Sequence, residues 1–341
     1  MSTDAPRLLV VGNFGPEHVG RHFAEAARAL GIDYTALATT AAYEGPPWAR
    51  RLFWQFGHRP LRIGRFGGGV VATAREVRAT ALLTTGIAPL GASVLQQLGE
   101  MGITRINFLT DDPWNPVHRA PWFMAGLNHY DHIFTPRRAN IEDLKTHGCK
   151  RVSYLPFAFS PVEHFPEARS AYSATTPVDD VFFAGGADPD RVPVMTALIR
   201  SGLRVALYGG YWDRFEATRP AARGMLDMAG IRHATGAARV SLCLVRRANR
   251  DGHAMRSFEA PAMRGCLLVE ATPDHREMFG PEGEAALYFR TPEEAAAQAH
   301  RLLSDAPLRD ALAARAHARV TSGANTYADR LRSILAVSAP A

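Results

Sequence analysis

Short apolar runs alternate with amphipathic segments along the first 155 residues. The runs have the length and the β-branched content of buried strands. They lie at 8–12, 34–38, 81–85, 105–109, 132–134 and 151–155. Between them the apolar positions recur with the period of a helix, at about 20–30, 69–80, 91–101, 119–128 and 138–147. This alternation is typical of a parallel sheet covered by helices, so it predicts one doubly wound domain.

A linker and a second alternating set come next in the chain. Residues 157–177 contain prolines, serines and threonines in an irregular order, which is typical of a linker. The linker residues are Pro161, Pro166, Ser170, Ser173, Thr175, Thr176 and Pro177. Strands are predicted after them at 180–184, 204–208, 241–245, 266–270 and 286–289. Helices are predicted at about 191–201, 221–229, 256–264 and 292–303, with an amphipathic helical tail at 307–336.

Together these patterns predict an α/β fold with two Rossmann-like domains, whose parallel sheets face a cleft between them. A chain of 341 residues is long enough for two cores. We expect a first domain at 1–160, a second at 175–325, and a last helix at 326–341 that packs back toward the first domain. In such folds ligands bind at the carboxyl ends of the strands.

Composition excludes several classes of protein. Hydrophobic residues make up 47% and charged residues 21%, as in soluble globular chains, so disordered and fibrous classes are excluded. No run approaches the ~18 apolar residues of a membrane span, and the apolar stretch at 8–11 is too short for a signal-peptide core. The sequence therefore predicts a cytoplasmic protein without a transmembrane segment.

The spacing of the cysteines and the net charge indicate which metals and binding partners the chain can have. Cys149, Cys243 and Cys266 show no CxxC spacing, so we expect buried reduced thiols and no metal site. Lys and Arg number 39 against 33 Asp and Glu, a net charge of +6. The Arg excess fits the codon usage of a GC-rich genome, but it also permits an anionic partner: a nucleotide, a phospholipid surface or a nucleic acid.

The loop after the first strand carries glycines at an anion-binding position. Gly12, Asn13, Gly15 and Gly20 open the first helix, where backbone amides and the helix dipole favour a diphosphate. The spacing is not GxGxxG, and a simple tight turn is the alternative.

Adjacent carboxylates come directly after the strand at 105–109. Asp111 and Asp112 lie where a base or a partner for substrate hydroxyls is expected, and Trp114 adds an aromatic surface for a sugar or a base. The alternative is a turn in which Asp112 caps the residues after it.

The segment 251–270 concentrates charged residues at the start of a helix. Asp251 and His253 lead into it, and Arg256 and Glu259 share one helical face. Arg256 suits a diphosphate and Glu259 suits paired ribose hydroxyls. An ordinary exposed salt bridge is the alternative.

Three stretches resemble the CgeB-like (spore-maturation type) glycosyltransferases, which have the GT-B fold and are related to the family 1 and family 4 nucleotide-sugar transferases. They are Arg-Ser-Phe-Glu-Ala-Pro-Ala at 256–262, Leu-Leu-Val-Glu-Ala-Thr at 267–272 and Phe-Leu-Thr-Asp-Asp-Pro-Trp at 108–114. Further motifs fall in the family's order at 131–135, 155–158, 182–185, 208–212 and around Thr326, Tyr327 and Arg330. The resemblance covers about 105–335.

The resemblance implies a glycosyltransferase that moves a sugar from a nucleoside-diphosphate sugar, a UDP- or dTDP-sugar, to an acceptor hydroxyl or other nucleophile. Transfer would be retaining and independent of a metal, with no cofactor. Asp188 and Asp190 have DxD spacing but fall in the phosphate loop. Two other interpretations remain: a non-catalytic two-lobed sugar or nucleotide binder, and a GT-B nucleotide-sugar epimerase.

Site residues are implied by the same resemblance. Glu259 matches the glutamate that binds ribose, Asp251 replaces the glutamate near the transferred sugar, and Arg191 matches the phosphate contact. Trp212 either stacks on the base or lies in the core. The expected catalytic residues are Asp111, Asp112, Asp251 and His253. The expected donor-binding residues are Gly12, Asn13, Gly15, Gly185, Gly186, Arg191, Tyr208, Gly209, Trp212, Arg256, Ser257, Phe258 and Glu259.

The stretch 48–78 carries arginines interleaved with aromatic residues. It contains seven arginines and a single acidic residue, Glu76. Such a surface binds phosphates, stacks bases or lies on anionic membranes, and a solvated basic face over core aromatics is the alternative. We expect it to flank the entrance for an anionic or amphipathic acceptor, with nucleic acid less favoured and the glycines at 67–69 as a mobile hinge.

Overall fold

The computed structural model describes residues 6–167 and 178–338 of the chain. Contacts divide the described residues into two compact units. The first falls within Met1–Pro156, Ala248–Arg250 and Tyr327–Ala341, and the second within Phe157–Arg247 and Asp251–Thr326. The linker residues predicted at 168–177, and with them the predicted start of the second domain at 175, lie outside the described residues.

The first unit is built on a parallel sheet, which has six strands among the described residues, in the order β2-β1-β3-β4-β5-β6. The strands are β1 (Leu8–Gly12), β2 (Tyr34–Ala38), β3 (Ala81–Thr85), β4 (Thr104–Phe108), β5 (His132–Thr135) and β6 (Val152–Tyr154). The helices are α1 (Val19–Ala29), α2 (Pro47–Gln55), α3 (Ile63–Glu76), α4 (Ala92–Glu100), α5 (Pro121–Met124), α6 (Ala139–Thr146) and α13 (Tyr327–Ser338).

Both faces of this first sheet are covered, because side chains of a buried strand alternate between them. On one face Leu9 and Val11 of β1 belong to a core with α3, α4 and α6. On the other face the ring of Phe108 meets that of Phe23 in α1 edge to face at 5.3 Å. Helix α13 packs on α1 there, since Tyr327 stacks on His22 with ring centroids 4.9 Å apart.

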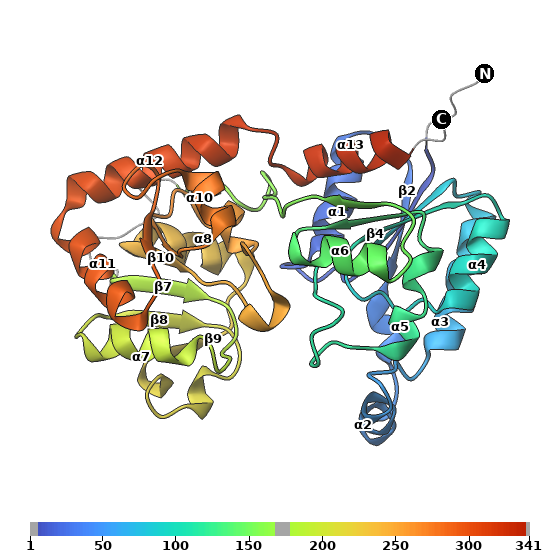
Figure 1. The fold of residues 1–341 in the computed structure, drawn as a ribbon, viewed down its shortest axis with the longest axis horizontal. Coiled ribbons are helices and arrows are strands. Elements are labelled where there is room, and N and C mark those ends of the chain that lie inside the picture. The colour runs from blue at the N-terminus through green and yellow to red at the C-terminus, as the bar shows by residue number, and fades with distance from the viewer. Residues whose placement is uncertain (1–5, 168–177, 339–341) are drawn as a thin grey trace. The chain divides into compact units, whose positions relative to one another are not determined.

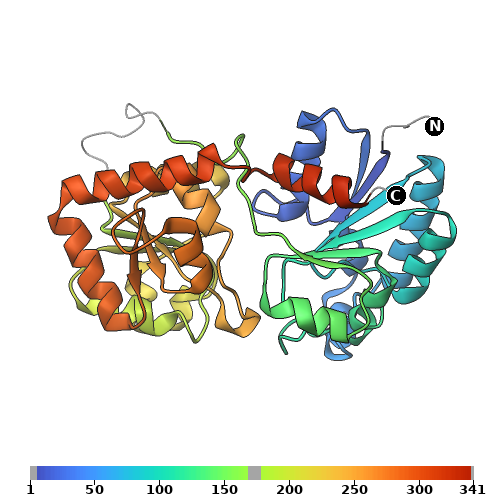
Figure 2. The same cartoon turned by 45° about the horizontal axis from the view of Figure 1, so that its top comes forward.

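The second unit is again a sheet with helices packed on it (Figures 1 and 2). Its sheet is parallel, with the strand order β12-β11-β10-β7-β8-β9. Its strands are β7 (Val181–Ala184), β8 (Val205–Tyr208), β9 (Ala222–Gly224), β10 (Val240–Cys243), β11 (Leu267–Glu270) and β12 (Leu287–Phe289). Its helices are α7 (Val192–Arg200), α8 (Met228–Ala237), α9 (Arg256–Ala262), α10 (Pro273–Phe279), α11 (Pro292–Ser304) and α12 (Ala306–Ser322). The larger core lies between this sheet and helices α7, α11 and α12.

The predicted fold class is confirmed, but three details of the elements differ. The helix expected at 221–229 is instead the strand β9 followed by α8, because Gly224 adopts a φ of +79° and Asp227 caps α8 by accepting from the amide of Gly230 at 2.7 Å. The tail is divided into α12 and α13 by a break at 323–326. Helices α2 and α10 were not predicted.

The glycines at 67–69 are not a hinge, since all three lie inside α3. A Cβ on Gly67 would lie 2.6 Å from a methyl carbon of Val94 in α4, whereas Gly68 and Gly69 face open space. Gly67 therefore lets α3 and α4 approach closely.

The three thiols are buried and free, as the spacing predicted. Burial raises the pKa of Cys149 to about 11 and those of Cys243 and Cys266 to about 12, so all three stay protonated. No helix within 6–167 or 178–338 is long and apolar enough to span a membrane.

Candidate functional site

In the second unit, the glycine loops that follow β7 and β8 pack backbone against backbone. Gly209 has a φ of +128°, and a Cβ built there would lie 2.3 Å from the carbonyl oxygen of Gly185. The amide of Gly185 donates to the carbonyl of Tyr208 at 2.8 Å, and that of Ala187 donates to Gly210 at 2.9 Å. The predicted residues Gly185, Gly186, Tyr208 and Gly209 thus lie together at the carboxyl edge of the second sheet.

Arg191 is held against the same pair of loops. Its Nη1 donates to the carbonyl of Gly186 at 3.0 Å, and its Nε lies 3.3 Å from Oδ2 of Asp188. Burial lowers the pKa of Arg191, although the charge of Asp188 opposes that shift. Oδ1 of Asp188 accepts from the amides of Asp190 and Arg191, both at 3.0 Å. The DxD spacing therefore forms a turn that leads into α7.

The loop before α9 is fastened to the start of α10. Thr272 Oγ1 donates to the carbonyl of Gly252 at 2.5 Å, and His253 Nδ1 lies 3.0 Å from Oδ2 of Asp274. His253 Nε2 accepts from the amide of Phe157 at 3.3 Å. Both ring nitrogens are engaged and the side chain is buried, so this geometry gives His253 a positioning role and does not support the catalytic one. Asp251 accepts from the amide of Arg246 at 3.2 Å.

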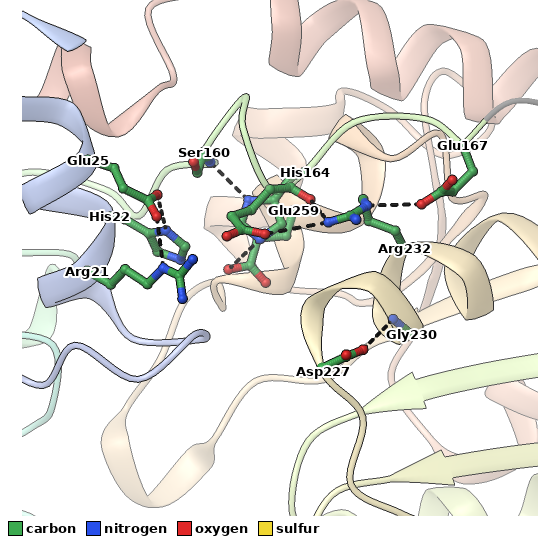
Figure 3. A network of polar contacts seen from close by, with 11 residues as sticks. Arg21, His22, Glu25, Ser160, His164, Glu167, Asp227, Gly230, Arg232 and Glu259 are labelled. Carbon is green, nitrogen blue, oxygen red and sulfur yellow. Dashed lines mark hydrogen bonds and ion pairs between the residues drawn. The ribbon is translucent and has the colours of Figure 1, made fainter. Parts of the chain in front are cut away.

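Arg256 and Glu259 share one face of α9, as their spacing predicted, and they form an ion pair there. Glu259 is buried, so the pair differs from the exposed salt bridge that was the alternative. Nε of Arg256 lies 3.5 Å from the carbonyl oxygen of Ala184, which connects α9 to the end of β7. Oε1 of Glu259 lies 3.7 Å from Nε2 of His164. Figure 3 shows His164 and Glu259 beside Arg232, which is ion-paired with Glu167 at 3.0 Å. Arg256 therefore lies near the carboxyl end of β7, and its guanidinium pairs with the carboxylate of Glu259.

Three predicted donor-binding residues belong to the core instead. Trp212 is buried, its Nε1 donates to the carbonyl of Gly185 at 2.8 Å, and its ring meets Phe183 edge to face. Ser257 is buried with its Oγ 2.8 Å from Nε2 of His275. Phe258 is buried against the ring of His253. All three side chains pack inside the unit, where they help to hold the loops at this edge of the sheet.

Two charged residues at this edge, Arg246 and Glu270, were missed. Oε2 of Glu270, at the end of β11, accepts from the amide of Val245 at 3.1 Å, while Oε1 pairs with Arg247 at 3.0 Å. Nε of Arg246 lies 4.0 Å from Oδ2 of Asp188. The available signal was position, since Arg246 directly follows the predicted strand at 241–245 and Glu270 is the last residue of β11.

In the first unit, the predicted residues of the loop after β1 form a tight turn. Oδ1 of Asn13 accepts from the amide of Gly15 at 2.9 Å, and Nδ2 of Asn13 lies 3.1 Å from Nε2 of His18. A Cβ on Gly12 would lie 2.5 Å from Oγ1 of Thr85, and one on Gly20 would lie 2.6 Å from the carbonyl oxygen of Asn13. Gly12 and Gly20 therefore allow close packing at this turn, and the predicted binding of a diphosphate by the loop stays a prediction.

Asp112 is fully engaged within the first unit. Its Oδ1 accepts from Nδ2 of Asn140 and from the amide of Trp114, both at 3.0 Å, and its Oδ2 pairs with Arg250 at 2.6 Å. The contact with the amide of Trp114 is the turn that the sequence offered as the alternative.

Asp111 is more open than its neighbour. One carboxylate oxygen accepts from Oγ1 of Thr110 at 3.0 Å, and the other lies 3.8 Å from Nε2 of His118. Burial lowers the pKa of His18, and the nearby charges of Glu17 and Asp111 oppose that shift. Because His18 belongs to the loop after β1, Asp111 lies near that loop as well as near His118. The side chain of Asp111 is 34% exposed.

Comparison with known proteins identifies the fold. A family described as glycosyl transferase-like matches residues 192–336. No curated protein sequence matches. The structure is similar to sucrose-phosphate synthase from Thermosynechococcus elongatus, with 14% identity, 98% of this chain and 100% of that chain covered and a TM-score of 0.69.

Two further solved structures agree with that result. HepE from Anabaena in complex with UDP and glucose has 10% identity, 97% and 100% coverage and a TM-score of 0.70. Trehalose-6-phosphate synthase, in a study of glycosyl transfer with retention, has 15% identity, 98% and 100% coverage and a TM-score of 0.67. The chain therefore has the two-domain fold of GT-B glycosyltransferases, and its part from α7 to α13 matches a glycosyl transferase-like family.

Proposed function

We propose that this protein is a glycosyltransferase that takes a sugar from a UDP- or dTDP-sugar and transfers it to an acceptor nucleophile. The observation that carries the proposal is the group of arginines at the carboxyl edge of the second sheet. Arg191, Arg246 and Arg256 lie beside the ends of β7 and β10. A departing nucleoside diphosphate gains negative charge, and fixed positive groups stabilise it.

Within this donor site, each residue has a distinct proposed task. Arg256 binds the diphosphate, and its ion pair with Glu259 fixes the guanidinium in place. Glu259 also accepts from the ribose hydroxyls, and Asp251 lies near the transferred sugar. The packed backbones at Gly185 and Gly209 hold the loops in position. The positive charges supply the stabilisation that metal-independent transfer requires.

We assign the acceptor side of the reaction to the first unit, with Asp111 as the base or hydrogen-bond partner of the acceptor. Asp112 is buried, whereas the side chain of Asp111, which also accepts from Nδ2 of Asn249 at 3.5 Å, is 34% exposed and lies close to His118. Retention of configuration, the CgeB-like subtype and a cytoplasmic location are parts of the proposal that rest on the sequence motifs and on the likeness to the enzymes named above.

Calorimetric titration with UDP and with uridine tests the donor site. Arg256→Ala is expected to weaken UDP binding about 10- to 150-fold, because a hydrogen bond to a charged group contributes about 1.5–3 kcal/mol. Uridine, which lacks the diphosphate, should bind nearly as before. Arg223→Ala, an exposed arginine on β9, is the matched control and should leave both affinities unchanged. Equal losses for UDP and uridine would contradict the diphosphate role.

The two alternative functions, a nucleotide-sugar binder and a nucleotide-sugar epimerase, predict different outcomes of an assay with donor and acceptor. A two-lobed binder would hold the nucleotide sugar without turnover, with or without acceptors. An epimerase would change the sugar of the donor without transferring it to an acceptor. Separating the products by chromatography distinguishes all three.

A further inference from the structure

Helix α2 exposes large hydrophobic side chains to an unusual degree. Ten such side chains are exposed among the described residues, and five of them lie between Trp48 and Phe56. Trp48 and Phe56 are each 72% exposed. The set on α2 and its C-cap is Trp48, Leu52, Phe53, Trp54 and Phe56. A contiguous exposed apolar patch of this kind marks an interaction surface.

The outward face of α2 follows helical spacing. Trp48, Leu52 and Phe56 are four residues apart, so they line one side of the helix. Ala49 is the single buried residue of α2, and it lies where the helix meets the rest of the first unit. A surface helix ordinarily turns its apolar stripe toward the core. Here the larger apolar side chains point away from it.

The segment around α2 is held at both ends and is not a loose loop. The amide of Arg62 donates to the carbonyl of Ala42 at 2.8 Å, and Arg62 pairs with Glu44 at 3.0 Å. Nε1 of Trp122 donates to the carbonyl of His58 at 3.2 Å, and Nδ1 of His58 lies 2.9 Å from the carbonyl oxygen of Arg119. Figure 1 shows α2 standing clear of the other helices of the first unit.

Positive charge surrounds this apolar face without acidic neighbours in sequence. Between Glu44 and Glu76 the chain contains no Asp or Glu. Arg50, Arg51 and Arg59 line a hollow of about 330 Å³ together with Tyr43 and Trp54. Arginines beside an aromatic floor bind phosphate groups, since the guanidinium donates in a fork and the ring accepts the apolar part.

We propose that the α2 surface, residues 47–65, binds an anionic lipid bilayer. Trp48, Leu52 and Phe56 insert at the level of the acyl boundary, as the apolar face of an interfacial helix does, while the arginines contact lipid phosphates. A groove for single-stranded nucleic acid would place its aromatic rings inside a charged channel. Here the outermost side chains, including aliphatic Leu52, stand on a convex helix, which favours the bilayer.

Sedimentation with vesicles tests this proposal, and no donor is needed. The chain is expected to bind vesicles of phosphatidylcholine with phosphatidylglycerol and to bind phosphatidylcholine alone far more weakly. Replacing Arg50, Arg51 and Arg59 with Ser should weaken binding about 100-fold, since about 1 kcal/mol for each arginine at an anionic surface corresponds to about fivefold. The same change at the exposed Arg223, Arg290 and Arg301 is the control and should have little effect.

A second set of variants tests the apolar contact. Replacing Trp48, Leu52 and Phe56 with Ser should abolish vesicle binding without lowering the melting temperature, because these side chains are exposed. Replacing the exposed Val117, Val162 and Met225 with Ser is the matched control. Brominated lipid should quench the fluorescence of the wild type more than that of Trp48→Phe.

Three results would overturn the proposal. They are the absence of binding to the anionic vesicles, binding that the α2 variants leave unchanged, and displacement from vesicles by a single-stranded oligonucleotide that binds more tightly than the lipid. The last result would assign the surface to nucleic acid. Loss of glycosyl transfer alone bears on the proposed function and not on this one.

Discussion

Substitution of Gly209 by Ala tests the packed glycine loops of the donor site. The φ of +128° lies where residues with a Cβ rarely occur, and this strain costs about 1–3 kcal/mol. The new Cβ would also lie 2.3 Å from the oxygen and 2.5 Å from the carbon of the Gly185 carbonyl. Overpacking against a fixed backbone costs about 1–3 kcal/mol more. The free energy of unfolding should fall by about 2–6 kcal/mol.

The matched control is the next residue in the chain. A Cβ on Gly210 meets no atom within 4 Å, and its φ lies outside the left-handed region. Gly210→Ala should therefore change the free energy of unfolding by no more than about 1 kcal/mol. Urea unfolding measures both variants, and titration with UDP should show weaker binding for Gly209→Ala alone. Unfolding of the two variants at the same urea concentration would contradict the close contact between Gly209 and the Gly185 carbonyl.

Three further predictions concern the donor site, the acceptor and pH. Glu259→Ala should weaken UDP binding by about 1–3 kcal/mol in calorimetry, because the ribose contact and the support of Arg256 are both lost; unchanged affinity would contradict both roles. Replacing Arg59 and Arg65 with Ser, which leaves the pair of Arg62 and Glu44 intact, should raise the KM for an anionic acceptor and flatten its salt dependence, because exposed charges are screened by salt, with donor hydrolysis unchanged; equal loss of both activities would mean that the segment supports the fold. Burial lowers the pKa of His275 from 6.5 to about 4, so the folded state keeps the ring neutral while the unfolded state takes up a proton. Stability should fall as pH drops from 6.5 to 4, by about 3 kcal/mol, and urea unfolding of His275→Gln should show a flatter dependence.

The strands were predictable because their signal is local. Each buried strand reads as a short apolar run, as at 8–12 and 81–85, and both runs match the observed β1 and β3. Helix α2 was not predicted, and it departs from the usual pattern because its apolar residues Trp48, Leu52 and Phe56 face solvent while only Ala49 is buried.

The candidate site was less predictable because tertiary contacts decide what a side chain does. From the sequence, Trp212 was equally consistent with stacking on a base and with burial in the core. Only the structure shows that its indole donates to the carbonyl of Gly185. His253 was predicted to be catalytic from its place before α9, and the contact of its ring with Asp274 of α10 could not be predicted from sequence. By contrast, the spacing of Arg256 and Glu259 was enough to predict that they share one helix face.

Transfer of a sugar from a nucleotide donor is tested most directly by donor turnover. Purified protein is incubated with UDP- and dTDP-sugars, with and without acceptors, and the nucleotides are separated by ion-exchange chromatography. We expect at least one nucleotide sugar to release its nucleoside diphosphate, and Arg256→Ala to slow this release far more than Arg223→Ala. Binding of the nucleotide sugars with no release under any condition would contradict the proposed transferase activity.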